Sequence, residues 1–577
     1  MTPDLRVRQR PVDRCEDHLP PDLHPVLRRV LLSRGLGDPE RLDLGLQRMA
    51  APSNLSGIDS AARLLAESLQ GDQRILVVGD FDADGATGTA LAVRGLRAMG
   101  ARNVEFRVPN RFEFGYGLTP GLVDTLAENP PDLLMTVDSG IACLAGVERA
   151  RALGIQVVVT DHHLPGEVLP SADAIVNPNL PGDTFPSKAL AGVGVVFYLL
   201  GAVRGVLRES GWFQGRRSEP NLARFLDLVA LGTVADVVPL DYNNRILVRQ
   251  GLERIRAGMA SPGVLALLRV GKRDYRHVVA SDLGFAAGPR LNAAGRLEDM
   301  GVGIRCLLSD DPEEALEIAE ELDTLNRQRK TLQETMQTEA VEQVETLLDS
   351  LGDQLPFSLC LHDDRWHQGI VGLVASRIKE AKHRPVIAFA PESEGAETLK
   401  GSARSISGLH IRDVLAHVDA GHPGLIRAFG GHAMAAGLSL ERERLDVFRQ
   451  ALEHSVRAFL DNEAPRREVL TDGELNPGDL ALDFAHELAA LGPWGQRYPE
   501  PLFEGAFEVV DQRIVGGAHL KMVLRPAEGG EPVDAIAFGM LPEDLPSRSR
   551  LRLLYRLDVN HFRGQTSVQL RVEHALR

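Results

Sequence analysis

The stretch that decides the fold reads ILVVGDFDADGATG and occupies residues 75–88. A short apolar run ends at Gly79 and is followed by Asp80, Asp82 and Asp84 in a glycine-rich turn. The run predicts a buried strand, and the small residues after the turn predict the start of a helix. Carboxylates this close together raise one another's pKa unless a cation neutralises them. The stretch therefore predicts a strand, a turn that binds a divalent metal, and a helix.

The same alternation of apolar runs and helical segments continues to residue 177. We expect strands at 75–79, 104–108, 133–138, 155–161 and 174–177, with helices such as 142–153 between them. This order predicts an α/β domain in which crossover helices connect the strands of a parallel sheet. Ligands of such sheets bind at the carboxyl ends of the strands.

Acidic and imidazole side chains follow two more of these strands. Asp138 ends one strand, and Asp161, His162 and His163 end the next, so a parallel sheet brings them to the same edge as the aspartate turn. Asp236 is a further acidic residue within an apolar stretch, where a carboxylate needs a partner or a metal. A single aspartate at a strand end is usually a cap, and a single histidine is usually structural, but their joint occurrence indicates a site.

The types of ligand in this set favour Mn²⁺ or Mg²⁺ over structural zinc, because carboxylates dominate and thiolates are missing. A shared carboxylate can bridge two such ions about 3.5–4 Å apart, which is the arrangement of two-metal phosphoester hydrolysis. An EF-hand is excluded because its twelfth position needs a glutamate and is Leu91 here. A turn without metal, in which the aspartates only cap the next helix, remains the alternative.

Size and composition narrow the class of protein. At 577 residues and 62.8 kDa the chain is large enough for three or four compact units. Its 44% hydrophobic and 25% charged residues are typical of globular proteins, and four scattered cysteines without a C-x-x-C pair suggest neither a disulfide framework nor a zinc site. We find no signal peptide, and the longest apolar run, 191–203, is too short to span a bilayer. We expect a soluble, cytoplasmic protein with no membrane partner.

The net charge of −16 does not exclude nucleic acid, because it is unevenly distributed. Residues 309–350 hold thirteen acidic against three basic side chains, whereas residues 511–577 hold eight against ten. The acidic segment has apolar residues at steps of three and four and predicts one long helix, 309–348, that connects two lobes. A smaller α/β unit follows, with strands at 357–361 and 385–390 around a helix at 370–381. The alternating pattern of the tail predicts a small β-barrel.

These motifs, in this order, resemble those of the DHH phosphoesterase superfamily. Further segments resemble the RecJ family within it, whose members degrade single-stranded DNA from the 5′ end: GPRLNAAGR at 288–296, WHQGIVG at 366–372, GSARS at 401–405 and GGHAMAAG at 430–437. The resemblance covers about residues 50 to 577. It implies a parallel-sheet DHH domain and a smaller α/β DHHA1 domain joined by a long helix, followed by an OB-like β-barrel.

The resemblance also implies roles for individual residues. Two ions, Mn²⁺ or Mg²⁺, would be held by Asp80, Asp82, Asp84, Asp138, His162 and Asp236. Asp82 and Asp84 would also be catalytic, His163 would face the scissile phosphate, and Asp161 would orient the adjacent imidazoles. The expected substrate-binding residues are Arg111, Tyr116, Arg290, Ser402, Arg404, Gly430, Gly431 and His432.

The expected function is metal-dependent, processive 5′ to 3′ hydrolysis of single-stranded DNA to mononucleotides in DNA repair and recombination. Its expected partners are a single strand with a 5′ end and, from the family alone, a single-strand-binding protein and a helicase. The alternatives are a phosphodiesterase for short oligonucleotides or cyclic dinucleotides and a metal-free DNA-binding scaffold. The expected domains are an extension at 1–50, DHH at 51–265, a linker region at 266–350, DHHA1 at 351–462 and an OB-like domain at 463–577.

Overall fold

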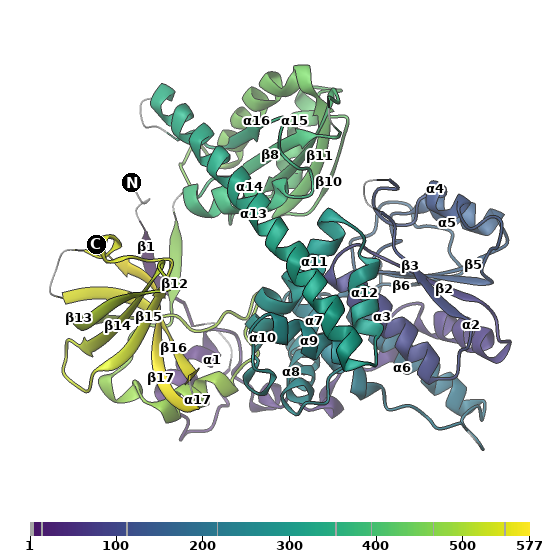
Figure 1. The fold of residues 1–577 in the computed structure, drawn as a ribbon, viewed down its shortest axis with the longest axis horizontal. Coiled ribbons are helices and arrows are strands. Elements are labelled where there is room, and N and C mark those ends of the chain that lie inside the picture. Colours follow the sequence, from purple (N-terminus) through teal and green to yellow (C-terminus); the bar gives the residue numbers. More distant parts are fainter. Residues whose placement is uncertain are drawn as a thin grey trace. The chain divides into compact units, whose positions relative to one another are not determined.

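The computed structural model describes residues 5–12, 16–110, 113–215, 217–351, 355–393, 395–465, 467–546, 550–562 and 564–576. The chain divides into two compact units (Figure 1). The larger unit holds residues 9–325 and 471–577, and the smaller unit holds residues 1–8 and 326–470. The boundary falls inside the long helix α13 (Pro312–Leu351), as the expected connecting helix requires.

The larger unit contains a five-stranded parallel sheet in the order β3-β2-β4-β5-β6. Its strands are β2 (Ile75–Gly79), β3 (Val104–Arg107), β4 (Leu133–Val137), β5 (Gln156–Thr160) and β6 (Ala174–Val176). In the register of the three central strands, Gly79 lies beside Val137, and Val137 lies beside Thr160. The residues that follow these three are all aspartates, so the sheet brings three carboxylates to one edge.

Helices cover both faces of this sheet, which explains why its strands are almost wholly apolar. Val77, Met135 and Val158 point into one core with α2 (Ile58–Gln70), α3 (Ala83–Ala98) and α6 (Gly192–Glu209). Their neighbours along the strands, such as Leu134 and Val157, point into a second core with α4 (Pro120–Asp124) and α5 (Leu144–Ala152). The predicted α/β fold is confirmed.

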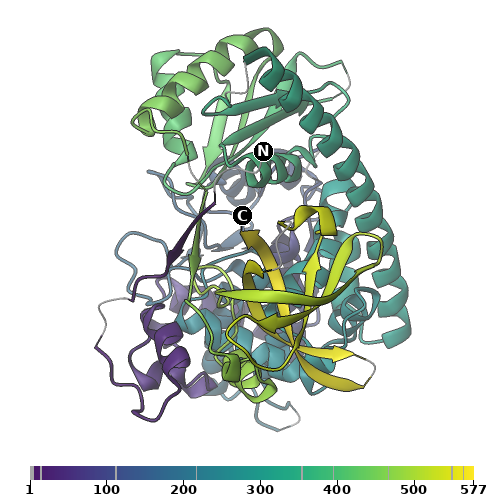
Figure 2. The same ribbon diagram turned by 90° about the vertical axis from the view of Figure 1, so that its left-hand side faces the viewer.

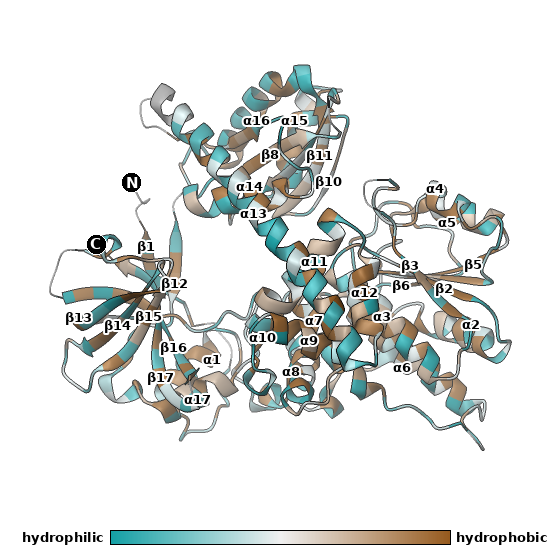
Figure 3. Cartoon of the chain, viewed as in Figure 1, coloured by the Kyte–Doolittle hydropathy of each residue, from teal (hydrophilic) through white to brown (hydrophobic). Residues whose placement is uncertain are grey.

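A further layer of helices packs on the first of these cores, where apolar residues gather on α7 and α9 (Figure 3). The layer consists of α7 (Leu226–Ala235), α8 (Tyr242–Arg256), α9 (Pro262–Val270), α10 (Ala280–Asp282), the π-helical turn η6 (Leu283–Ala287), α11 (Gly288–Leu297) and α12 (Gly301–Leu308). Most of the expected linker region is therefore part of the core of the larger unit. None of the helices in the described ranges has an apolar stretch long enough to cross a membrane.

The tail forms a closed barrel in the order β13-β14-β15-β17-β16 (Figure 2). Its strands are β13 (Phe503–Val515), β14 (His519–Pro526), β15 (Val533–Phe538), β16 (Arg550–Phe562) and β17 (Gln565–Leu576). Leu520, Met522 and Leu524 share the buried face that their alternation predicts. The barrel core also receives side chains from α17 (Leu482–Ala490) and from α1 (Pro25–Leu32) near the amino terminus.

The smaller unit is built on the sheet β10-β11-β9-β8-β7, in which only β7 and β8 are parallel. Its elements are β7 (Leu359–His362), α14 (Val371–Lys382), β8 (Val386–Pro391), β9 (Thr398–Arg404), α15 (Ile411–Gly421), β10 (Ala428–Gly431), β11 (Ala435–Glu441) and α16 (Leu445–Phe459). Where the chain passes between the two units, β1 (Arg6–Gln9) and β12 (Glu468–Thr471) form a two-stranded sheet.

Candidate metal centre

The turn after β2 is shaped by Asp82, which is the N-cap of α3. Its Oδ1 accepts hydrogen bonds from the backbone N–H of Asp84 and of Gly85, both at 3.0 Å. A side chain at position 85 would lie 2.6 Å from the carbonyl oxygen of Asp80, so only glycine fits this turn. The capping alternative is therefore correct for one oxygen of Asp82, but it does not account for Asp80 and Asp84, which are both buried.

Asp84 is held by the amino terminus of α6. The N–H of Gly192 donates to its Oδ2 at 2.6 Å, and the N–H of Val193 donates to its Oδ1 at 2.9 Å. The partial positive charge of a helix amino terminus stabilises a carboxylate in this position. A Cβ atom at position 192 would lie 2.7 Å from Cβ of Asp138, so glycine allows the helix to approach the site this closely.

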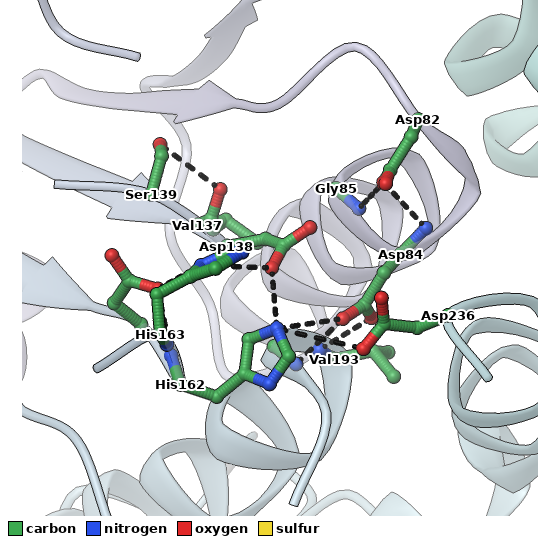
Figure 4. A network of polar contacts seen from close by, with 12 residues as sticks. Asp82, Asp84, Gly85, Val137, Asp138, Ser139, His162, His163, Val193 and Asp236 are labelled. Atoms are coloured by element: carbon green, nitrogen blue, oxygen red, sulfur yellow. Dashed lines mark hydrogen bonds and ion pairs between the residues drawn. The ribbon is translucent and has the colours of Figure 1, made fainter. Parts of the chain in front are cut away.

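His162 lies at the centre of the cluster (Figure 4). Its Nε2 is 3.0 Å from Oδ1 of Asp138, 3.5 Å from Oδ2 of Asp236 and 3.9 Å from Oδ2 of Asp84. Asp138 adopts a left-handed backbone conformation with φ of 59°, which aspartate tolerates better than most residues. Asp236 is the C-cap of α7, directly after the last helical residue. Side chains from the ends of β4 and β5, the start of α3 and the end of α7 thus meet at the imidazole of His162.

The ligand atoms form three groups, in each of which they all lie within 4.8 Å of one another. The groups are Asp80, Asp82 and Asp138; Asp84, His162 and Asp236; and Asp138, His162 and His163. Asp138 and His162 each belong to two groups, as expected of ligands near a pair of ions. Hard carboxylate oxygens with imidazole nitrogen suit Mn²⁺ and Mg²⁺, so the donor set fits the metals that the sequence predicts.

The electrostatics of the cluster support the same assignment. Burial raises the pKa of Asp84 and of Asp138 well above the ordinary value, and the neighbouring carboxylates raise it further. Burial and the charge of Asp82 likewise raise the pKa of Asp236 to about 7. Packing acidic groups this densely is unfavourable for the protein alone, and a divalent cation between them would remove the repulsion.

His163 and Asp161 form a hydrogen-bonded pair at the edge of the cluster. Nδ1 of His163 is 2.8 Å from Oδ1 of Asp161, whose carboxylate also accepts the N–H of Ile141 at 2.9 Å. Burial lowers the pKa of His163, but the hydrogen bond to Asp161 and the surrounding carboxylates outweigh it and raise the pKa to about 9. For Asp161, burial raises the pKa, but its hydrogen bonds lower it overall. The pair is therefore ionic at neutral pH.

Two residues predicted to bind substrate lie in the larger unit within the described ranges. The hydroxyl of Tyr116 donates to the carbonyl oxygen of Asp138 at 3.2 Å, and its ring meets the ring of His163 edge to face at 6.2 Å. The guanidinium of Arg290 is instead engaged by Asp323 of α13 at 2.7 Å and by the carbonyl oxygen of Ala286. Arg111, the third candidate, lies outside the described residues.

The other predicted substrate-binding residues lie in the smaller unit. Across its neighbouring strands, Gly430 pairs with Gly437, and Gly437 pairs with Ser402, so one row of the sheet carries almost no side chains. Nη1 of Arg404 donates to Oγ of Ser402 at 2.8 Å. Gly431 and His432 follow at the end of β10, and the N–H of His432 donates to the carbonyl oxygen of Ala435 at 2.7 Å.

Several residues that the sequence analysis did not single out position the centre. Oδ1 of Asn292 accepts the N–H of Ala83 at 2.8 Å and so fixes the start of α3. The side-chain amides of Asn177 and Asn179 donate to the carbonyl oxygens of His163 and His162 at 2.9 and 2.7 Å. Asn292 lies in the segment GPRLNAAGR, from which the sequence analysis assigned a role to Arg290 alone.

Comparison with known proteins places this geometry in a family. Three family models match the chain: the N-terminal domain of the DHH family at residues 74–233, the DHHA1 domain at 352–458 and the RecJ OB domain at 471–574. The single-stranded-DNA-specific exonuclease RecJ of Escherichia coli K12 is 52% identical over 100% of this chain and 99% of its own.

Two solved structures of RecJ from Thermus thermophilus also match. The complex with Mn²⁺ has a TM-score of 0.80 at 32% identity and covers 99% of this chain and 79% of that chain. The complex with Mg²⁺ has a TM-score of 0.74 at 31% identity and covers 99% of this chain and 78% of that chain. Both metals predicted from the sequence are thus found in structures that share this fold.

Proposed function

Because this chain belongs to the RecJ family, we propose that it is a metal-dependent exonuclease that hydrolyses single-stranded DNA from the 5′ end. The observation that carries the proposal is the sharing of Asp138 and His162 between ligand groups, which suits a pair of ions rather than one. The ions would be held by Asp80, Asp82, Asp84, Asp138, His162 and Asp236. When bound, they supply positive charge at the scissile phosphate and lower the pKa of the attacking water.

The side chains of the protein orient the reacting groups. We assign His163 to the substrate phosphate, because Nδ1 of its imidazole is paired with the Asp161 carboxylate and this pairing raises the pKa of the ring. Asp161 accepts the Nδ1 proton, which leaves the Nε2 proton to be donated to a phosphate or leaving oxygen. Gly192 and Val193 fix Asp84 through their backbone N–H groups, so this ligand does not have to reorganise when an ion binds.

Recognition of the 5′ end is assigned to the predicted substrate-binding residues. A guanidinium fork and glycine backbone suit a terminal phosphate, and Arg404 with Ser402 beside the glycine row offers both. Tyr116 would stack on a base beside His163. The remaining residues assigned to the strand are Arg111, Arg290, Gly430, Gly431 and His432.

The proposal extends to the organisation and setting of the enzyme. Residues 51–265 would form the catalytic DHH domain, 266–350 the connection, 351–462 the DHHA1 domain and 463–577 the DNA-binding barrel, preceded by an extension at 1–50. A barrel of this type suits single strands because stacking platforms tolerate any sequence. We assign to the enzyme processive release of mononucleotides, a role in repair and recombination in the cytoplasm, and a single-strand-binding protein and a helicase as partners.

The test is to compare substrates in the presence of Mn²⁺. We expect a 5′-phosphorylated single strand of about 50 nucleotides to be degraded from its 5′ end, while a blunt duplex of the same sequence survives. The Asp138→Asn variant should lose at least about 100-fold in rate, as expected for a lost charge-stabilising group. The matched control Asp59→Asn, in the exposed first turn of α2, should retain full activity. Equal attack on strand and duplex would reject the proposal.

A second comparison separates the main alternative. A phosphodiesterase for short oligonucleotides or cyclic dinucleotides would cleave a trinucleotide at least as efficiently as the long strand. The barrel and α13 favour the long strand, since a short substrate does not need either. Faster cleavage of the trinucleotide would therefore support the alternative, and binding of DNA without any cleavage would support a scaffold.

A further inference from the structure

Phe285 is the most exposed large apolar side chain in the described part of the protein. It is 81% exposed, although phenylalanine is usually buried. It lies on η6, a π-helical turn inserted between α10 and α11, and such turns are rare and are found mostly at functional sites. Exposure and unusual backbone together indicate that this side chain has a function other than packing.

The helical segment that carries Phe285 packs directly on the end of α7, where Asp236 is the C-cap. A Cβ atom at Gly284 would lie 3.3 Å from Cγ1 of Val234, and one at Gly288 would lie 3.1 Å from Cβ of Ala235. These are the last residues of α7 before Asp236. Phe285 therefore emerges next to the helix end that presents this carboxylate.

The same segment also contacts the aspartate turn that follows β2. Asn292 accepts the N–H of Ala83 in the aspartate turn, and a Cβ atom at Gly295 would lie 1.8 Å from the carbonyl oxygen of Phe81. Residues 284, 288, 292 and 295 form one packed stripe along η6 and α11, because residues three and four apart share a helix face. Phe285 is next to Gly284 in this stripe, on a segment that contacts both the end of α7 and the aspartate turn.

A second exposed apolar side chain follows Asp236 in the sequence. Val237 directly follows Asp236, is 64% exposed and has φ of 62°. A β-branched residue is a genuine outlier in the left-handed region, and strain of this kind clusters at ligand sites. Asp236 thus has an exposed apolar neighbour on its own chain and another, Phe285, on the helix packed against it.

We propose that Phe285 is a positioning residue that stacks on a nucleobase of the strand whose phosphate lies at the metal centre, and that Val237 contributes apolar surface to the same strand. This inference rests on the proposed function. A single strand offers unpaired bases with free π faces, and an aromatic ring binds them whatever the sequence. In a duplex these faces are stacked within the helix, so the contact favours single strands.

The test uses the full-length protein with Mn²⁺ and two single strands, one normal and one with abasic nucleotides at its 5′ end. Loss of one base stack is expected to lower kcat/KM of Phe285→Ala on the normal strand by between about 5-fold and about 150-fold. The loss should lie mainly in KM, Phe285→Trp should restore the activity, and the variant should equal wild type on the abasic strand. The control Met259→Ala, also an exposed apolar residue at 65%, should match wild type on both strands.

Two results would overturn the inference while leaving the proposed function intact. One is Phe285→Ala activity within about 2-fold of wild type on the normal strand, well below the effect of one lost stack. The other is an equal loss on normal and abasic strands, which would mean that the ring supports the fold of the site instead of a base. Failure of wild-type protein to cut either strand would instead reject the proposed function.

Discussion

Removing the guanidinium of Arg34 should loosen the attachment of the barrel. Arg34 follows α1 and forms a bidentate ion pair with Asp472, with Nη1–Oδ1 at 2.7 Å and Nη2–Oδ2 at 3.1 Å. The two side chains are 2% and 0% exposed. Arg34 also donates to the carbonyl oxygen of Pro499 at 2.8 Å. The pair therefore links the amino-terminal segment to the residues on both sides of α17.

The expected magnitude follows from burial. Arg34→Ala removes the bidentate partner of the buried Asp472 carboxylate and leaves it only the longer contact to Nε of Arg10 at 3.8 Å, so the cost is up to about 3–5 kcal/mol of unfolding free energy. The exposed pair between Arg28 and Asp17 at 2.6 Å is the matched control. Its loss in Arg28→Ala should lower the free energy of unfolding much less, because water screens the charge of Asp17.

Trp494 provides a local signal for the measurement. Its ring stacks on Tyr498 at 4.8 Å and lies 5.4 Å from the Arg34 guanidinium carbon. In a background with Trp212→Phe and Trp366→Phe, urea unfolding followed by fluorescence reports on this region alone. Since the urea m-value of a unit this large exceeds the value of about 1–3 kcal/mol/M that small proteins have, Arg34→Ala should lower the midpoint by up to about 1 M, and clearly more than Arg28→Ala does. A shift no larger than that of Arg28→Ala would refute the reasoning.

Three further predictions concern the metal centre. Gly192→Ala places a methyl group against Asp138 and should weaken Mn²⁺ binding at least about 10-fold by calorimetry; unchanged affinity would mean that α6 gives way easily. Asn292→Ala leaves the N–H of Ala83 buried without its acceptor and should lower the free energy of unfolding by about 1–3 kcal/mol in urea titrations. An unchanged free energy of unfolding would mean that a water molecule replaces the lost acceptor. His163→Ala should lower kcat by about 10²–10⁴-fold while Mn²⁺ affinity stays nearly constant; parallel loss of both would make His163 a ligand instead.

The sequence predicted the metal-binding edge well because its signal is local. Asp138 and Asp161 directly follow apolar strands, and parallel topology alone brings such positions together. The strand and helix boundaries differ from those expected by only a few residues, since turn residues mark them. The meeting of the aspartate turn, Asp138 and the histidine pair at one edge could thus be anticipated from the topology, whereas Asp236, at the end of α7, joined the predicted ligands only through the family resemblance.

What the sequence could not supply depends on packing between distant segments. Asn292 reaches Ala83 across more than two hundred residues, and its motif gives no indication of that partner. The ion pair between Arg290 and Asp323 of α13 likewise has no local signal in the sequence around Arg290. Val26, Leu27 and Val30 belong to the barrel core although they lie at the opposite end of the chain.

The metal centre also shows how the fold tolerates an acidic cluster that would otherwise oppose folding. Two backbone N–H groups at the start of α6 neutralise part of the charge on Asp84, and the protonated His163 offsets the charge of Asp161. Oδ1 of Asp138 and Oδ2 of Asp236 are buried and accept no hydrogen bond from the described residues, and burial and nearby carboxylates raise the pKa of both side chains. The charge left over is therefore concentrated around His162, at the position where the ligand groups overlap. Backbone and imidazole donors thus compensate part of the charge of Asp84 and Asp161, and a cation bound to the cluster would compensate the rest, so metal binding would also stabilise this edge of the sheet.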